Sequence, residues 1–211
     1  MRFQTPAADC GLCPRLVAFR HANAAAFPDW HNAPVPSFGP ANARLLIVGL
    51  APGLRGANRT GRPFTGDFAG ELLYPTIAAF GFGTGPFEAR PDDGFRMLGA
   101  RVTNAVRCVP PQNKPTTPEI KACNRFLKAE IESMPDLRAI LALGLVAHKA
   151  ILQALGLTAA RYPFAHGAMQ ALPTGLLLAS SYHCSRYNTN TGRLTAEMFR
   201  KVFADLRERL A

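Results

Sequence analysis

The sequence predicts an α/β fold in which a small, mostly parallel sheet lies between two layers of helices. Four short apolar segments have the length and composition of buried strands, and segments with helical periodicity alternate with them. This alternation requires crossover connections, so neighbouring strands run parallel and helices cover both faces of the sheet. The chain has 211 residues, of which 48% are hydrophobic, enough for one domain with a sizeable core. We therefore expect a single three-layer αβα domain over residues 1–211.

The predicted elements follow one another in a regular order. Residues 67–80 have a helical composition, and Pro75 is expected to kink this helix or to remove one hydrogen bond, because proline has no N–H to donate. Thr117 and Pro118 form an N-cap and first-turn pair for the next helix, and residues 145–155 form a third. The last helix has an apolar stripe that packs on the sheet: Leu194, Met198, Val202, Leu206 and Leu210. The predicted strands are residues 44–50, 101–106, 138–143 and 176–182.

The loops after the strands are basic and contain the unusual residues of the chain. Ligands of parallel sheets bind at the carboxyl ends of strands, where loops begin at Gly49, Asn104, Gly144 and His183. The net charge is +10, and residues 55–62 and 183–193 contain arginines but no acidic residue. A polyanionic partner such as nucleic acid is favoured, because each neutralised phosphate releases condensed counterions. An Arg-rich surface that merely keeps the protein soluble is the alternative.

No segment has the features of a membrane span or a secretion signal. The most apolar run, residues 139–147, is about half the ~20 residues that a spanning helix needs. Residues 1–10 have no apolar signal-peptide core. We therefore expect a cytosolic protein with no membrane partner.

Four of the five cysteines are placed so that they can converge. Cys10 and Cys13 form a C-x2-C pair, Cys108 ends the loop after the second strand, and Cys123 lies in the next predicted helix. Such thiols in a cytosolic chain favour a metal or iron-sulfur centre over disulfides. The spacing does not distinguish tetrahedral zinc from a cluster, and Cys108 and Cys123 are alternatively small buried hydrophobic residues. Cys184 stands apart.

The loop after the first strand is rich in glycine and exposes backbone N–H groups that suit an anion. It matches neither the P-loop nor the dinucleotide-binding pattern, so the sequence does not favour a nucleotide cofactor. Phe64 and Asp67 follow this loop. From the residues alone, Phe64 is a core aromatic or a ligand contact, and Asp67 is a helix N-cap or a catalytic carboxylate.

Several motifs are specific when taken together. They are Gly49-Leu-Ala-Pro-Gly53, Gly56-Ala-Asn-Arg-Thr-Gly-Arg62 with Phe64-Thr-Gly-Asp67, Thr103-Asn104 before Cys108-Val-Pro-Pro, and His183 with Asn188-Thr-Asn-Thr-Gly-Arg193-Leu-Thr. In these motifs, which cover nearly the whole chain, the protein resembles the family 5 (B-type) uracil-DNA glycosylases. The resemblance implies a 4Fe-4S cluster held by Cys10, Cys13, Cys108 and Cys123, in an N-terminal cluster-binding segment and its neighbours.

The resemblance also implies an activity. The enzyme would hydrolyse the N-glycosidic bond of uracil and other deaminated or damaged bases, which must first leave the DNA stack, and it would leave an abasic site. His183 would hydrogen-bond to the base oxygen that becomes negative, and Asp67 would orient water. Leu50 stands where most uracil-DNA glycosylase families have a polar or acidic residue, and this agrees with a broad range of lesions. The base-binding residues would be Gly49, Ala51, Phe64, which stacks on the base, and Asn104, which reads its edge.

The implied partner is DNA, double-stranded and also single-stranded, bound by a monomer. Arg59, Arg62 and Arg193 would contact phosphates. Arg186, Tyr187 and Asn188 are the candidates to fill the gap that the flipped base leaves. No lysine is placed as a Schiff-base nucleophile, so we expect a monofunctional enzyme.

Three alternatives remain. An A-type iron-sulfur uracil-DNA glycosylase would have a Glu in the first motif, where this chain has Leu50 and Ala51. A DNA-binding protein with a structural metal centre and no catalysis would bind uracil-containing DNA without releasing the base. The third alternative, an iron-sulfur electron carrier, is disfavoured because the basic, Asn-rich loops would have no function in it.

Overall fold

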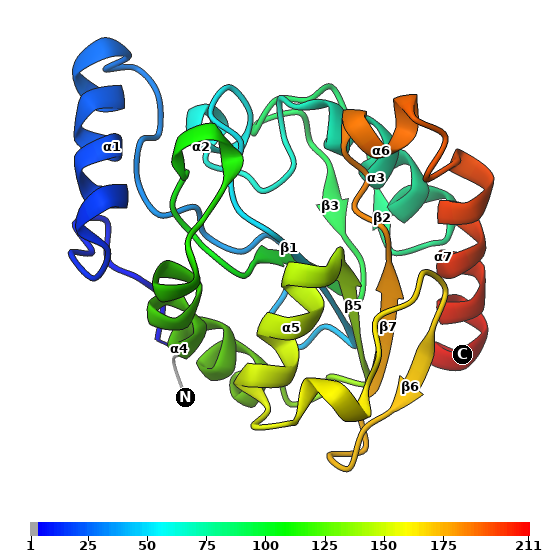
Figure 1. Cartoon of the computed structure of the whole chain (residues 1–211). Helices are drawn as coiled ribbons and strands as arrows, with labels where there is room; N and C mark the ends of the chain where they lie inside the picture. Colours follow the sequence, from blue (N-terminus) through cyan, green and yellow to red (C-terminus); the bar gives the residue numbers. More distant parts are fainter. Residues whose placement is uncertain (1–3) are drawn as a thin grey trace.

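The centre of the molecule is a five-stranded sheet with the order β4-β1-β5-β7-β6 (Figure 1). The computed structural model describes residues 4–211. Residues 1–3 lie outside the described part, and they belong to the segment 1–10 for which no signal peptide is predicted. β6 is antiparallel to β7, and the other neighbouring strands are parallel. The predicted mostly parallel sheet is confirmed. Its strands are β1 (Leu45–Gly49), β4 (Ala100–Asn104), β5 (Ala139–Leu143), β6 (Met169–Ala171) and β7 (Leu177–Ser181).

Three of the four predicted strand segments contain an observed strand, and β4 begins one residue before the predicted residues 101–106. The side chains of β1, β4 and β5 are buried along their whole length, as expected for strands that are covered by helices on both faces. Sequence patterning did not predict β6, which is short and only half-buried. It also missed a separate hairpin of β2 (Gly83–Thr84) and β3 (Arg96–Met97).

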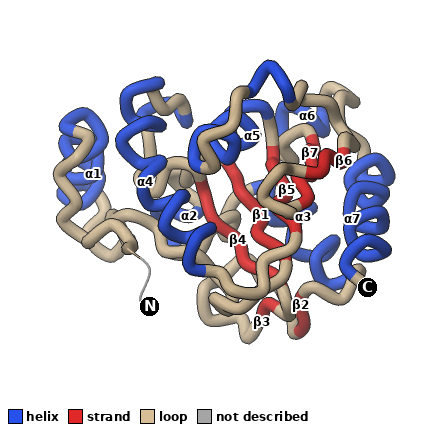
Figure 2. Tube along the Cα trace, turned by 90° about the horizontal axis from the view of Figure 1, so that it is seen from below, coloured by secondary structure: helices blue, strands red, loops and turns tan. Residues whose placement is uncertain are grey.

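Helices lie on both sides of the sheet, and Figure 2 shows the strands enclosed between them. Successive strand residues point to opposite faces, which divides the core into two clusters. Leu45 and Ile47 pack with α3 and α7, whereas Leu46 and Val48 pack with α4 and α5. The predicted three-layer arrangement is therefore confirmed. The longer helices are α1 (Pro14–Ala26), α3 (Phe68–Ala79), α4 (Thr117–Ser133), α5 (Leu145–Ala154) and α7 (Ala196–Leu210).

The helix ends agree with the sequence in most details. α3 continues through Pro75, and α7 begins after the N-cap Thr195. The predicted cap of α4 is wrong by one residue: Thr116 is the N-cap, and its backbone N–H donates to the Glu119 carboxylate at 2.7 Å. Capping boxes of this kind satisfy backbone donors that have no partner within the helix. Among the helices of residues 4–211, none has the length and apolar character that crossing a membrane requires.

The helix α1, which sequence patterning did not predict, lies at one edge of the molecule beside α4 (Figures 1 and 2). Arg15 joins the two helices, because its guanidinium makes two hydrogen bonds to Glu119 at 2.8 and 2.7 Å. Arg20 is buried and donates to the backbone oxygens of Ala8 and Cys10. The N-terminal segment is thus held to the sheet layer through α4.

Candidate active site

A cleft of about 610 Å³ lies at the carboxyl ends of β1, β5 and β7. This is the edge at which ligands of parallel sheets bind. The chain segments that follow these strands bring together residues from distant parts of the sequence. The lining includes Leu50, Ala51, Gly53, Asp67, Gly144, His183, Arg186, Asn188 and Arg193.

Gly49, Phe64 and Asn104 are packed closely beside this cleft. Gly49 ends β1 and pairs in register with Asn104, which ends β4. A Cβ atom on Gly49 would lie 2.4 Å from Cζ of Phe64 and 2.5 Å from Oδ1 of Asn104, so only glycine fits. The Asn104 side chain is buried, and its Oδ1 atom has no hydrogen-bond partner among residues 4–211. A buried acceptor without a partner is costly, which makes this oxygen a candidate ligand contact.

Asp67 is both the N-cap of α3 and part of the cleft wall. Its carboxylate accepts the backbone N–H of Gly70 at 3.3 Å, so the capping interpretation is confirmed. The same carboxylate lies against Gly56, where a Cβ would approach Oδ2 to 2.5 Å. Burial raises the pKa of Asp67, and backbone hydrogen bonds from Gly70 and Ala69 oppose that effect. Capping and a catalytic role are compatible, because the side chain also faces the cleft.

His183 follows β7 and is half-buried in the cleft wall. Its ring lies 5.9 Å from the ring of Phe64, centroid to centroid, with 29° between the planes. Burial lowers the pKa of His183 to about 4, so the imidazole is neutral near pH 7. A neutral ring still has one N–H donor, which suits a hydrogen bond to a base oxygen.

The loop after His183 forms the rim of the cleft. The Asn188 amide donates to the His183 backbone oxygen at 2.8 Å and so fixes the backbone of that residue; its contact with DNA stays a prediction. Arg186 and Arg193 are exposed and lie over the rings of Phe68 and Tyr182. Tyr187 is 71% exposed and is the most exposed large hydrophobic residue among residues 4–211. Sequence patterning placed it among three candidates without a means of ranking them.

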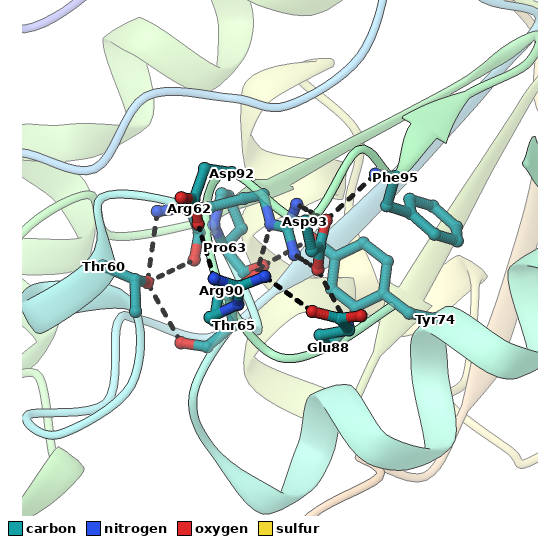
Figure 3. A network of polar contacts seen from close by, with 10 residues as sticks. All are labelled: Thr60, Arg62, Pro63, Thr65, Tyr74, Glu88, Arg90, Asp92, Asp93 and Phe95. Carbon is teal, nitrogen blue, oxygen red and sulfur yellow. Dashed lines mark hydrogen bonds and ion pairs between the residues drawn. The ribbon is translucent and has the colours of Figure 1, made fainter. Parts of the chain in front are cut away.

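The predicted phosphate contact of Arg62 is wrong. Its side chain is buried and makes two hydrogen bonds to the Asp93 carboxylate, at 2.8 and 2.7 Å (Figure 3). A guanidinium held in this way cannot reach a phosphate at the surface. Sequence reasoning missed Asp93 as its partner, because nothing in the pattern connects two positions 31 residues apart. Arg59 is exposed, as a phosphate contact requires.

The four predicted cysteines lie around one apolar cavity beside the cleft. Cys10 and Cys13 come from the segment that leads into α1, Cys108 from the loop after β4, and Cys123 from α4. The backbone N–H of Arg107 donates to Sγ of Cys123 at 3.4 Å. Within residues 4–211, no three His, Cys, Asp or Glu side chains form a group that could hold a single metal ion. Cys184 is buried in the core that packs against α3 and α7, apart from the other cysteines.

Comparison with known proteins identifies the family. The sequence model of the uracil DNA glycosylase superfamily matches residues 36–207. The chain belongs to this superfamily. A type-5 uracil-DNA glycosylase of Thermus thermophilus is 49% identical over 202 residues, which cover 93% of this chain and 91% of the relative. One of Mycobacterium leprae is 42% identical over 207 residues, which cover 94% and 90%.

Type-4 uracil-DNA glycosylases match less of the chain. That of Pyrobaculum aerophilum is 36% identical over 123 residues, which cover 58% of this chain and 55% of the relative. The longer matches to type-5 relatives confirm the resemblance that the motifs indicated. They also agree with Leu50 and Ala51 in the first motif, where an A-type enzyme would have a Glu.

Proposed function

We propose that this member of the uracil-DNA glycosylase superfamily removes uracil from DNA by hydrolysing its N-glycosidic bond. The observation that carries the proposal is the buried, unpartnered Oδ1 of Asn104 beside Phe64. The uracil edge has an N–H donor next to a carbonyl acceptor, and an asparagine amide matches both. With Phe64 stacked on its face, a flipped base would be read by ring and edge together.

His183 and Asp67 would act on the two products of bond cleavage. As the bond breaks, negative charge collects on the departing base and positive charge on the sugar. The neutral imidazole of His183 would donate a hydrogen bond to the base oxygen that becomes negative, and its low pKa supports this neutral form. The Asp67 carboxylate, at the N-cap of α3 in the cleft wall, would stabilise the cationic sugar and orient a water molecule. The apolar Leu50 and Ala51 favour a range of lesions that extends beyond uracil.

The rim would hold the DNA. The exposed Arg59, Arg186 and Arg193 would contact phosphates, and Tyr187 would enter the duplex in place of the flipped base. Among the three candidates for this last role, Tyr187 is favoured because it is exposed and aromatic. We expect a cytoplasmic, monomeric enzyme that acts on duplex DNA and also on single strands, and that leaves an abasic site.

A 4Fe-4S cluster bound by Cys10, Cys13, Cys108 and Cys123 is part of the proposal. In such a cluster each thiolate binds its own iron, so the ligands surround a cavity, as these four side chains do. Burial raises the pKa of Cys108 to about 12, while the nearby Arg20 acts in the opposite direction. Thiols in this environment need a cationic centre to remain thiolates. When bound, the cluster would supply iron–sulfur bonds that join α1, the loop after β4 and α4.

The first experiment measures release of free base from labelled duplexes that carry uracil, hypoxanthine or ethenocytosine. Anaerobically purified protein should release base from several of these duplexes, and its His183→Ala variant should not. Binding without release would instead support a DNA-binding protein with a structural metal centre.

The cluster has a separate test. Iron and sulfide should be present in equal amounts, should be lost from a Cys108→Ser variant and should be retained by Cys184→Ser. Full iron content in the Cys108→Ser protein would contradict the assignment.

A further inference from the structure

One group of buried polar residues takes no part in the proposed chemistry and is drawn in Figure 3. At its centre is the pair of Arg62 and Asp93, whose side chains are 5% and 0% exposed. The Asp93 carboxylate also accepts the backbone N–H groups of Glu88 and Phe95, each at 3.0 Å. These bonds hold the pKa of Asp93 well below its usual range, with the bond from Arg62 as the largest cause. The pair is therefore fully charged and rigidly held.

Buried hydrogen bonds around the pair hold both chain neighbours of Phe64, which are Pro63 and Thr65. Nε of Arg62 donates to Oγ1 of Thr65 at 2.7 Å. On the other side of Phe64, the Tyr74 hydroxyl donates to the Pro63 backbone oxygen at 2.6 Å. The Arg62 guanidinium also lies over three aromatic rings, those of Phe38, Tyr74 and Phe87, at 5.1, 5.2 and 5.6 Å.

Phe64 itself has an unfavourable backbone conformation. Its φ is +53°, in the left-handed region that side chains other than glycine rarely adopt. Such a conformation persists at a binding site only when the surrounding structure enforces it. Here the backbone oxygen of Phe64 lies against Gly70, where a Cβ would approach it to 1.8 Å. In this conformation the ring lies against Gly49 and beside His183.

We propose that the buried Arg62–Asp93 pair is a positioning device that holds Phe64 in its left-handed conformation and thereby aims its ring at the flipped base. Arg62 and Asp93 are positioning residues, since they act through Phe64 and touch no reacting atom. This inference rests on the proposed function, because it assigns Phe64 to the base pocket. The buried pair need not add stability, since ion pairs of this kind are often no better than apolar packing.

The test is a double-mutant cycle on the rate of base excision in a single turnover. Asp93→Asn keeps the shape of the side chain but removes its charge, and it should slow excision by roughly 10- to 100-fold, as expected for a misplaced contact. Affinity for an undamaged duplex should stay unchanged. In a Phe64→Leu background, the same Asp93→Asn change should slow excision by less than about twofold, since the ring that it positions is absent.

Two further variants serve as a control for the loop and as a second test of the positioning role. Arg90→Ala removes an exposed ion pair with Glu88 from the same loop and should leave the excision rate unchanged. Tyr74→Phe removes the hydrogen bond to Pro63 without leaving a buried charge, so it tests the device if Asp93→Asn fails to fold. It should slow excision about fivefold, and only when Phe64 is present.

The outcomes separate the two proposals. If the effects of Asp93→Asn and Phe64→Leu multiply, the pair has a structural role only and the inference is overturned. If the Arg90→Ala control slows excision as much as Asp93→Asn does, the loop as a whole matters and the inference also fails. If the unmodified protein releases no base from any lesion, the proposed function itself is wrong.

Discussion

The base pocket and the rim of the cleft differ in how their side chains are held. In the pocket, Gly49, Phe64 and Asn104 are buried and are fixed by close contacts that admit almost no substitution. On the rim, Arg186 and Tyr187 are exposed. In the proposed function, the pocket would determine which base is read and how fast it is released, while the rim would determine how DNA is held. Pocket variants should lose rate at constant affinity, whereas variants outside the pocket should act through their contacts with the DNA.

The largest expected effect is that of Asp67→Asn. Excision should slow by roughly 10²- to 10⁴-fold, the usual contribution of a catalytic carboxylate, because the amide carries no negative charge to stabilise the sugar. Asparagine is as good an N-cap as aspartate, so the thermal midpoint should hardly change. Asp67→Ala is the matched control that loses the cap as well. If Asp67→Asn excises base as fast as the unmodified protein, and only Asp67→Ala loses rate together with stability, Asp67 is only a cap.

Gly49→Ala should have the next largest effect. The added methyl group must displace the Phe64 ring or the Asn104 amide, which lie 2.4 and 2.5 Å from it. We expect excision to slow by roughly 100-fold, because displacements of about 1 Å have effects of this size. Binding of an abasic duplex, measured by fluorescence anisotropy, should stay unchanged. A parallel loss of duplex affinity would show that the pocket also contributes to DNA binding, contrary to the distinction between pocket and rim.

On the rim, Tyr187→Ala tests whether this side chain replaces the flipped base. Excision from duplex DNA should fall about tenfold, since a stacked aromatic contributes ~1–3 kcal/mol. Excision from single-stranded DNA should not change, because no stack has to be filled there. Tyr187→Phe retains the ring and should behave like the unmodified protein. An equal loss on both substrates would place Tyr187 in general DNA binding instead.

The Arg59→Ala variant should have a smaller effect that depends on salt. Loss of one phosphate contact should reduce the slope of log affinity against log salt concentration by about 1, with the single-turnover rate unchanged. Arg209→Ala is the matched control: it is also exposed, but it lies next to Arg44 and Arg138, which precede β1 and β5 at the opposite end of the sheet. If both variants change the slope equally, general positive charge explains the binding.

The difference between buried and exposed residues also explains which parts of the fold and of the site the sequence predicted. The apolar segments and their alternation with helices predicted the sheet and its layers, because burial leaves a clear pattern. The sequence did not predict the short strand β6, since its three residues, two half-buried and one exposed, carry little periodicity. Motif resemblance assigned the residues of the pocket. It misplaced Arg62 on the DNA surface, because whether an arginine is buried depends on its partner, and Asp93 lies 31 residues away.

The smallest expected effect on rate concerns pH. Because the pKa of His183 is about 4 in the folded protein and about 6.5 in an unfolded chain, its ring should stay neutral between these values, and its NMR signals should show no midpoint near pH 6.5. Excision should then show no ionisation of His183 in this window.

The stability of the fold, in contrast, should depend on pH, because in this window the unfolded chain binds a proton at His183 that the folded chain does not. The free energy of unfolding should therefore fall by up to about 3 kcal/mol as pH drops from 6.5 to 4. His183→Gln should reduce this slope without abolishing it, since burial also lowers the pKa of His148 and His166. A His183 midpoint near 6.5 would mean that the ring is solvated, and would remove the argument that a neutral donor faces the departing base.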